Sequence, residues 1–342
     1  MPTNNNTAAP AAVSIWWFAF GYFACYVPYS ALTKAVSSGW LEKMDGHGVA
    51  GFQLLPLSVG ASMLGMFAFI TAMGWWKYAN HGDGGKLPRP TGWTLASGIC
   101  TSAIIATTTL AYTFDGISIV FMMLLMRGGV LILAPVVDAV SGRKVRWFSG
   151  MALLFSLGAL FVAFWEKKGF DITLIATIDV SVYLMSYFIR LQFMSRRAKS
   201  SDTKARTAYF VEEQMVASPF LFVLLVIAAL IGQGEIMENI RAGFVDVGQS
   251  SILFEVIVIG LFSQGTGIFG GLILLDKREN TFCVPVNRSS SIMAGVIAST
   301  SLWLIFDQAS RPSYYQLAGA GLIIMAIVFL ALPSLLPKRT QT

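Results

Sequence analysis

Some charged side chains of this sequence lie deep inside long apolar segments, where they could bind a charged ligand or carry a proton. Burying one charge in a bilayer costs at least ~2.5 kcal/mol on the most lenient insertion scale, so each needs a partner or a function. An arginine can hold an anion, whereas a carboxylate can neutralise a cation or take up a proton. The candidates are Arg127, Asp179, Glu212, Glu213 and Arg288.

Arg288 and the two adjacent glutamates are expected at a similar depth, because each lies about six residues inside a segment that starts on the same side. Neighbouring residues of a helix point about 100° apart, so we expect Glu213 to face the centre and Glu212 to face a neighbour. Two interpretations stay open. Glu213 and Arg288 form a salt bridge that locks two helices, or a substrate or proton exchanges with that bridge.

Ten apolar segments must position these residues. The chain has 342 residues and is 12% charged, about half the ~25% that is typical of soluble domains. Each segment is close to the ~20 residues that a helix needs to cross a bilayer, and the lack of alternating polarity argues against a β-barrel. We therefore predict an all-α integral membrane protein with spans at 15–36, 49–76, 94–114, 117–139, 147–165, 172–193, 208–232, 252–275, 282–306 and 315–336.

Four further charges lie near segment ends. Lys34, Asp138 and Arg190 are within about four residues of an end, and we interpret each as a side chain that extends to the lipid headgroups. Glu255 is also close to an end, and both interpretations stay open for it.

The loops between the segments differ in basic residues. Loops on the side of the N-terminus hold 15 lysines and arginines, against five on the other side. Basic residues resist translocation, so both termini are predicted to be cytoplasmic. Residues 1–14 carry no basic side chain, so the first segment is expected to stay as a helix rather than act as a cleaved signal peptide. Short termini favour a bacterial inner membrane over an organelle.

The ten segments divide evenly into two halves. Five is an odd number, so homologous halves would insert in opposite directions, as in many secondary transporters. We predict a cytoplasmic tail at 1–14, repeats at 15–167 and 168–336, and a second tail at 337–342. Small residues at 318–321 in the last segment would also fit a homodimer interface.

Two short motifs resemble those of nucleotide-sugar transporters. The stretch 281–291 is similar to their GALNK motif, and 210–219 is similar to their FYNN motif followed by a proline. With ten segments, the chain resembles the drug/metabolite transporter superfamily over residues 15–336. The resemblance implies that Glu212, Glu213, Asn287 and Arg288 contribute to a central substrate site, although both FYNN asparagines are glutamates here.

The basic residue in the fourth segment adds a second resemblance. Arg127 matches Arg288 in helix number between the halves, and it is similar to basic residues that hold phosphate in plastid sugar-phosphate translocators. The leading hypothesis is therefore a secondary carrier that moves a small polar, anionic metabolite by alternating access. Arg127 and Arg288 would hold the anion, and Glu213 would be a counter-ion or proton carrier. A counter-substrate could replace the proton.

An alternative function keeps the fold and reverses the substrate charge. An exporter of amines, amino acids or cationic drugs would use Glu213 as counter-ion, with aromatic residues such as Tyr29 stacking on the cation. The predicted substrate-binding residues are Tyr29, Arg127, Asp179, Glu212, Glu213, Asn287 and Arg288.

Enzymatic functions are disfavoured by the missing motifs. The histidines, His47 and His81, lie outside the apolar segments, so no helical zinc pair or serine–histidine dyad can form within them. The three cysteines are an odd number and indicate neither a disulfide framework nor a metal cluster. We expect no catalytic residue, cofactor, metal or nucleic-acid partner. The expected partners are a small-molecule substrate, a proton or counter-substrate, and the lipid bilayer.

Overall fold

The computed structural model describes residues 14–82, 87–110, 119–165, 174–199, 201–309, 311 and 313–335. Within these ranges the chain is all-helical, with eleven α-helices, three short 3-10 helices and no β-strand. The α-helices are α1 (Ile15–Ser37), α2 (Gly51–Ala72), α3 (Gly92–Leu110), α4 (Ile119–Val140), α5 (Trp147–Trp165), α6 (Leu174–Arg197), α7 (Thr203–Ile231), α8 (Glu235–Val245), α9 (Leu253–Leu274), α10 (Asn280–Ile305) and α11 (Tyr314–Leu335).

Each of the ten predicted segments coincides with one helix, and α8 is an addition. By length and composition, three helices of the described chain could cross a membrane, namely α2, α7 and α9. The predicted tails lie outside the described residues apart from Ser14, as does the predicted boundary between the repeats at 167 and 168.

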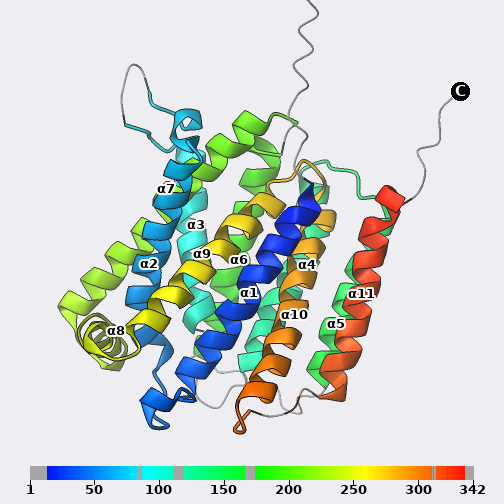
Figure 1. Ribbon diagram of the computed structural model, residues 1–342. Helices are drawn as coiled ribbons and strands as arrows, with labels where there is room; N and C mark the ends of the chain where they lie inside the picture. The colour runs from blue at the N-terminus through cyan, green and yellow to red at the C-terminus, as the bar shows by residue number, and fades with distance from the viewer. Residues whose placement is uncertain are drawn as a thin grey trace, which may run out of the picture.

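The helices pack in a pattern that links the two halves of the sequence (Figure 1). In the first half, α1 contacts α9 and α10; in the second half, α6 contacts α3 and α4. The contact of α3 with α7 has its counterpart in the contact of α9 with α2. The contact of α4 with α5 has its counterpart in the contact of α10 with α11. The pairs α2 and α7, α4 and α10, and α5 and α11 also touch. The first helix begins and the last helix ends at the same end of the bundle (Figure 1).

Two glycines allow close approach at equivalent helix pairs. A side chain at Gly260 of α9 would overlap the carbonyl oxygen of Ser58 in α2. A side chain at Gly98 of α3 would overlap Val216 in α7. These contacts need a residue without a Cβ, because the neighbouring backbone or branched side chain has no room to move.

Helix α8 is short and lies against α2 and α7. Gln53 donates a hydrogen bond from its Nε2 to Asn239 over 3.0 Å. Arg241 donates from Nε and Nη2 to the carbonyls of Ala229 and Leu230, at 2.7 and 3.0 Å. It therefore satisfies carbonyls at the end of α7 that have no partner within that helix.

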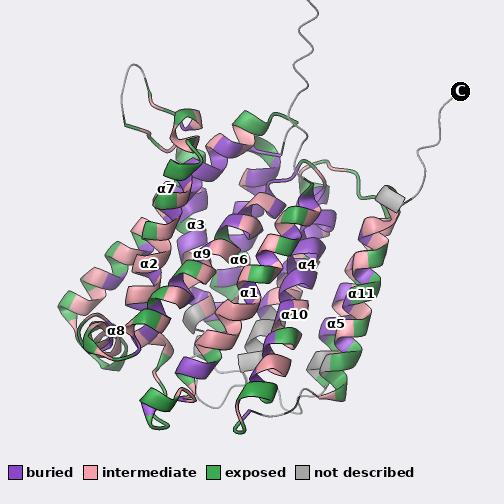
Figure 2. Cartoon of the chain, in the orientation of Figure 1, coloured by how far each residue is buried: buried purple, intermediate pink, exposed green. Residues whose placement is uncertain are grey.

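Polar side chains are buried at several places within a mostly apolar core, and many large apolar side chains are exposed on the outside of the bundle. Residues 279–291, at the start of α10, are all buried although they include polar and charged side chains (Figure 2). Exposed apolar side chains together with buried polar ones are typical of proteins surrounded by lipid. Large exposed apolar side chains include Leu64, Ile132, Leu154, Phe161, Trp165, Val223, Ile227, Phe254, Leu261 and Ile324.

Candidate functional site

Arg127 of α4 faces a group of tyrosines on α1. Its Nη2 donates a hydrogen bond to the hydroxyl of Tyr26, and its guanidinium carbon lies 5.3 Å from the centroid of the same ring. The Tyr26 ring lies 5.5 Å from that of Tyr22 and 5.7 Å from that of Tyr29. Three aromatic rings on one face of α1 thus lead to this guanidinium.

Arg288 of α10 meets an equivalent pair of tyrosines on α6. Its guanidinium carbon lies 4.9 Å from the ring centroid of Tyr187. The Tyr187 ring lies 4.8 Å from that of Tyr183. Arg288 is 5% exposed, and its Nε and Nη2 are buried without a hydrogen-bond partner. Because an uncompensated buried cation is destabilising, Arg288 is the strongest candidate for holding an anion.

The two arginines belong to one site, which we call the arginine–tyrosine cluster. Among the ion pairs of the described residues, none includes Arg288. Tyr22 and Tyr183 each interact electrostatically with both guanidinium groups. The cluster consists of Tyr22, Tyr26, Arg127, Tyr183, Tyr187 and Arg288.

The members of the cluster repeat along the chain with one offset. Positions 22 and 183, 26 and 187, and 127 and 288 are each 161 residues apart and hold the same residue type. The first two pairs lie on α1 and α6, and the third lies on α4 and α10. These are the helices that the packing pattern places in equivalent positions.

The predicted substrate-binding residues include none of the four tyrosines of the cluster. They include Tyr29, whose ring lies next to that of Tyr26. A usable signal exists, since each pair has a four-residue spacing on one helix face and the same offset as the two arginines.

Glu213 does not pair with Arg288, contrary to our expectation. Its Oε1 and Oε2 accept hydrogen bonds from Nε and Nη2 of Arg190, at 2.8 and 2.9 Å. The hydroxyls of Ser97 and Thr101 on α3 also donate to its Oε1. Depth in the sequence gives the position of a side chain along a helix but not its direction. The predicted pairing of Glu213 with Arg288 was therefore wrong, and Arg190 is the partner. Arg190 is 6% exposed, so its interpretation as a headgroup-reaching side chain was also wrong.

Glu212 points to a different neighbour, as the 100° spacing predicts. Its carboxylate accepts the backbone N–H groups of Asn80 and Thr91 and the hydroxyl of Thr94, at 3.0, 3.1 and 2.8 Å. It therefore fastens the connection between α2 and α3 onto α7 and takes no part in the arginine–tyrosine cluster.

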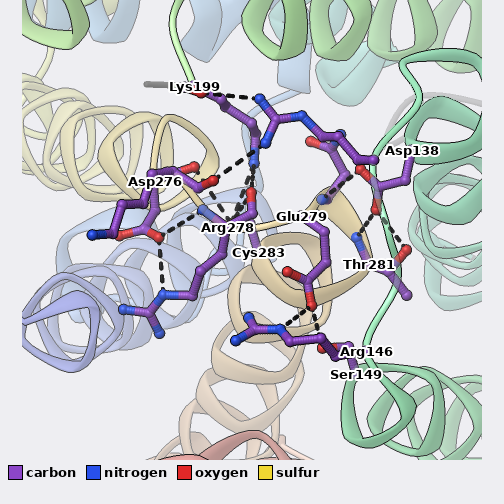
Figure 3. A network of polar contacts seen from close by, with 12 residues as sticks. Asp138, Arg146, Ser149, Lys199, Asp276, Arg278, Glu279, Thr281 and Cys283 are labelled. Atoms are coloured by element: carbon purple, nitrogen blue, oxygen red, sulfur yellow. Dashed lines mark hydrogen bonds and ion pairs between the residues drawn. The ribbon is translucent and has the colours of Figure 1, made fainter. Parts of the chain in front are cut away.

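Asp138 is fully buried and does not reach towards headgroups as we expected (Figure 3). Its Oδ1 accepts the backbone N–H and the Nδ2 of Asn280, at 2.8 and 2.7 Å. Its Oδ2 accepts the backbone N–H and the hydroxyl of Thr281, both at 2.7 Å. A carboxylate from α4 thus caps the first turn of α10, where unpaired N–H groups and the helix dipole favour a negative charge.

Other charged residues around this cap join α5, α6 and the α9–α10 loop (Figure 3). Arg146 and Ser149 donate to Glu279 at 2.8 and 2.7 Å, and Lys199 donates to the carbonyl of Arg278 at 2.9 Å. Burial alone would raise the pKa of Glu279. The hydrogen bonds from Arg146 and Ser149 outweigh burial and hold the pKa of Glu279 below its ordinary value. We call Asp138, Arg146, Ser149, Lys199, Glu279 and Thr281 the end network.

Replacement of Asp138 by alanine is expected to destabilise the protein by about 3 kcal/mol, because several buried donors lose a charged acceptor. The measurement is the free energy of unfolding in mixed detergent micelles. Glu255→Ala is the matched control, since the Lys43–Glu255 pair is only partly buried and should contribute less than about 1 kcal/mol. Equal losses in the two variants would contradict the capping role.

The other predicted site residues occupy distinct places. Asn287 is 3% exposed on α10 and lies close to Gly270 of α9, as does Tyr22. Asp179 on α6 is 5% exposed, and neither of its oxygens has a hydrogen-bond partner. Lys34 is exposed near the end of α1, as expected.

Comparison with known proteins adds information on the fold. No protein-family model matches the sequence, and no curated protein matches it. One solved structure, described only as "Crystal structure of protein", has a TM-score of 0.55 and 13% sequence identity, over 96% of this chain and 99% of that chain. At this identity the similarity concerns the fold alone, which therefore extends over almost the whole of both chains.

Proposed function

We propose that this protein is a membrane-embedded secondary carrier that moves a small organic anion by alternating access. The observation that carries the proposal is the buried guanidinium of Arg288, which has two unpartnered nitrogens and shares its tyrosine neighbours with Arg127. An anion bound between the two arginines would supply the missing acceptors, because guanidinium groups bind carboxylates and phosphates through paired N–H donors.

The surface of the helical bundle supports a position in the bilayer. Large apolar side chains are exposed on the outside of α4, α5, α7, α9 and α11. The basic loop residues of the end network lie at the end of the bundle where α1 begins and α11 ends (Figure 1). With the excess of basic residues on that side, this arrangement supports ten spans with both termini in the cytoplasm.

The packing pattern supports two inverted five-helix repeats. Exchanging α1, α2, α3, α4 and α5 for α6, α7, α9, α10 and α11 converts most of the helix contacts into one another. The 161-residue offset within the arginine–tyrosine cluster follows the same exchange. In this arrangement the cluster lies where the repeats meet, which is the usual place for a substrate site in carriers of this kind. It is also the arrangement expected for a member of the drug/metabolite transporter superfamily.

The charge of the site favours an anion over an amine. To bind a cationic substrate, Glu213 would have to give up its salt bridge with Arg190 and its hydrogen bonds from two hydroxyl groups. Breaking such a buried pair leaves an uncompensated charge and is strongly unfavourable. The site around Arg288 needs no such loss to accept a negative charge.

The end network supports a state that is closed towards the cytoplasm. Asp138 and Glu279 tie α10 to α4 and α5, and Lys199 ties the end of α6 to the α9–α10 loop. Opening on this side would require these contacts to separate, so a carrier could alternate by making and breaking them.

The test is a thermal-unfolding screen of the purified protein with succinate, citrate, glycerol 3-phosphate and uridine monophosphate, against choline and lysine. An anion at about 100 times its Kd should stabilise the protein by roughly 2.7 kcal/mol. The stabilising anion is then tested for uptake into proteoliposomes. Stabilisation by the amines alone would contradict the proposed function.

A further inference from the structure

Asp179 differs from the other buried acidic residues in having no donor. Asp138 and Glu212 accept several hydrogen bonds each, and Glu213 is paired with Arg190. Asp276 and Glu279 are paired with Arg278 and Arg146. Both oxygens of Asp179 are buried without a partner. Since burial without donors disfavours a charged carboxylate, this side chain is the one best suited to take up a proton.

Asp179 also has a direct structural relation to the arginine–tyrosine cluster. Asp179, Tyr183 and Tyr187 follow one another at four-residue spacing, so they share one face of α6, and all three are buried. Tyr187 contacts the guanidinium of Arg288. At a rise of ~1.5 Å per residue, Asp179 lies about 12 Å along the helix from Tyr187.

Among the charged groups around α6, the two arginines of the cluster are the ones expected to influence the protonation of Asp179. Cys100, the titratable residue of the described part of α3, interacts with Arg190 and Glu213. Arg190, at 11 residues from Asp179, is three turns away and neutralised by Glu213. The charged or titratable residues on described parts of α3, α4 and α6, with the cluster arginine of α10, are Cys100, Arg127, Asp138, Asp179, Tyr183, Tyr187, Arg190, Arg196, Arg197 and Arg288. On α7, Glu213 and Tyr209 lie near Arg190 rather than near Asp179.

We propose that Asp179 binds the proton that is transported together with the anion, an inference that rests on the proposed function. An anion at the cluster cancels positive charge, which makes the ionised carboxylate less favourable and the protonated one more favourable. By linkage, protonation of Asp179 then strengthens anion binding by the same factor. Tyr187, which contacts Arg288, lies about 12 Å from Asp179 along α6. An anion at a similar distance, with an effective dielectric constant of ~20, would give a factor on the order of tenfold. Two ligands that strengthen each other's binding travel in the same direction, so the coupling is symport.

The first experiment determines the protonation state of Asp179 without any substrate. Infrared difference spectra of the wild type and Asp179→Asn are recorded at pH 5 in the same detergent. We expect the variant to lose the C=O stretching band of a protonated carboxyl group. Glu255→Gln is the matched control, and it should lose a carboxylate band because Glu255 is paired with Lys43. Loss of a carboxylate band in Asp179→Asn would overturn the proposal.

The second experiment measures the coupling between the charge of the cluster and the protonation of Asp179. Replacing an arginine removes positive charge from the cluster, which mimics the binding of an anion. The Asp179 band is followed against pH in the wild type, Arg288→Met and Arg127→Met. The proton affinity of Asp179 should rise in both arginine variants, by an amount on the order of tenfold in Arg288→Met, and either variant that folds can be used for the test. Lys144→Met, which removes an exposed cation from the α4–α5 loop, should leave it unchanged. An unchanged affinity in the arginine variants would overturn the coupling.

These results are independent of the anion screen. A protonated, arginine-coupled Asp179 in a protein that binds no anion would contradict the proposed function and leave the proton site in place. Anion binding in a protein whose Asp179 is ionised would support the proposed function and contradict the proton site.

Discussion

Replacement of Arg288 by methionine should strongly weaken anion binding without destabilising the free protein. A guanidinium that holds a buried anion through charged hydrogen bonds contributes about 2 kcal/mol or more, so affinity for the anion identified by the screen should fall by at least about 30-fold. In the free protein, two nitrogens of this side chain are buried without a partner. An apolar side chain of similar length removes that unfavourable burial, and we expect the free energy of unfolding to stay the same or to rise by about 1 kcal/mol.

The two measurements together distinguish a binding residue from a structural one. A residue that only supports the fold would lose stability on substitution, and ligand affinity would fall as a consequence. Arg127→Met should weaken anion binding in the same way, because the two arginines share Tyr22 and Tyr183 as neighbours. Lys34→Met removes an exposed cation near the end of α1 and is the control for net charge. An unchanged affinity in Arg288→Met would show that the anion binds elsewhere.

The helices could be predicted because their signal is local. Ten apolar segments of sufficient length each became a helix, with most ends within a few residues of the prediction. Helix α8 was missed because it has only 11 residues, carries Glu235, Glu238 and Arg241, and resembles a polar loop in composition. Its position depends on contacts with α2 and with the end of α7, which sequence alone does not reveal.

The partners of the buried charges could not be predicted, because they depend on the direction in which each helix faces its neighbours. Depth within a segment correctly selected Arg127, Glu213 and Arg288 as buried or partly buried residues. Closeness to a segment end was misleading for Asp138 and Arg190. Each lies next to another helix that supplies donors or an opposite charge. A short distance to the lipid headgroups does not favour exposure when a partner is closer.

The buried pair of Arg190 and Glu213 should behave in the opposite way to Arg288. Arg190→Met leaves the Glu213 carboxylate without its main partner, and Glu213→Leu leaves a buried guanidinium, so each single variant should lose about 3 to 5 kcal/mol of unfolding free energy. The double variant removes both charges at once. Ser97 and Thr101 can donate to carbonyls of their own helix instead, as Thr101 already does to Ser97.

We therefore expect the double variant to recover most of the stability lost by either single variant, so the coupling energy in the double-mutant cycle should exceed either single loss and reach about 5 kcal/mol or more. The measurement is unfolding in mixed micelles for the four proteins of the cycle. Strictly additive losses would mean that the two side chains act independently, against the bidentate geometry. The double variant should also keep its anion affinity, because the pair holds α6 against α7 and neither residue belongs to the arginine–tyrosine cluster, the proposed anion site. If anion binding were lost with the pair although stability was recovered, Glu213 or Arg190 would have to contact the substrate directly.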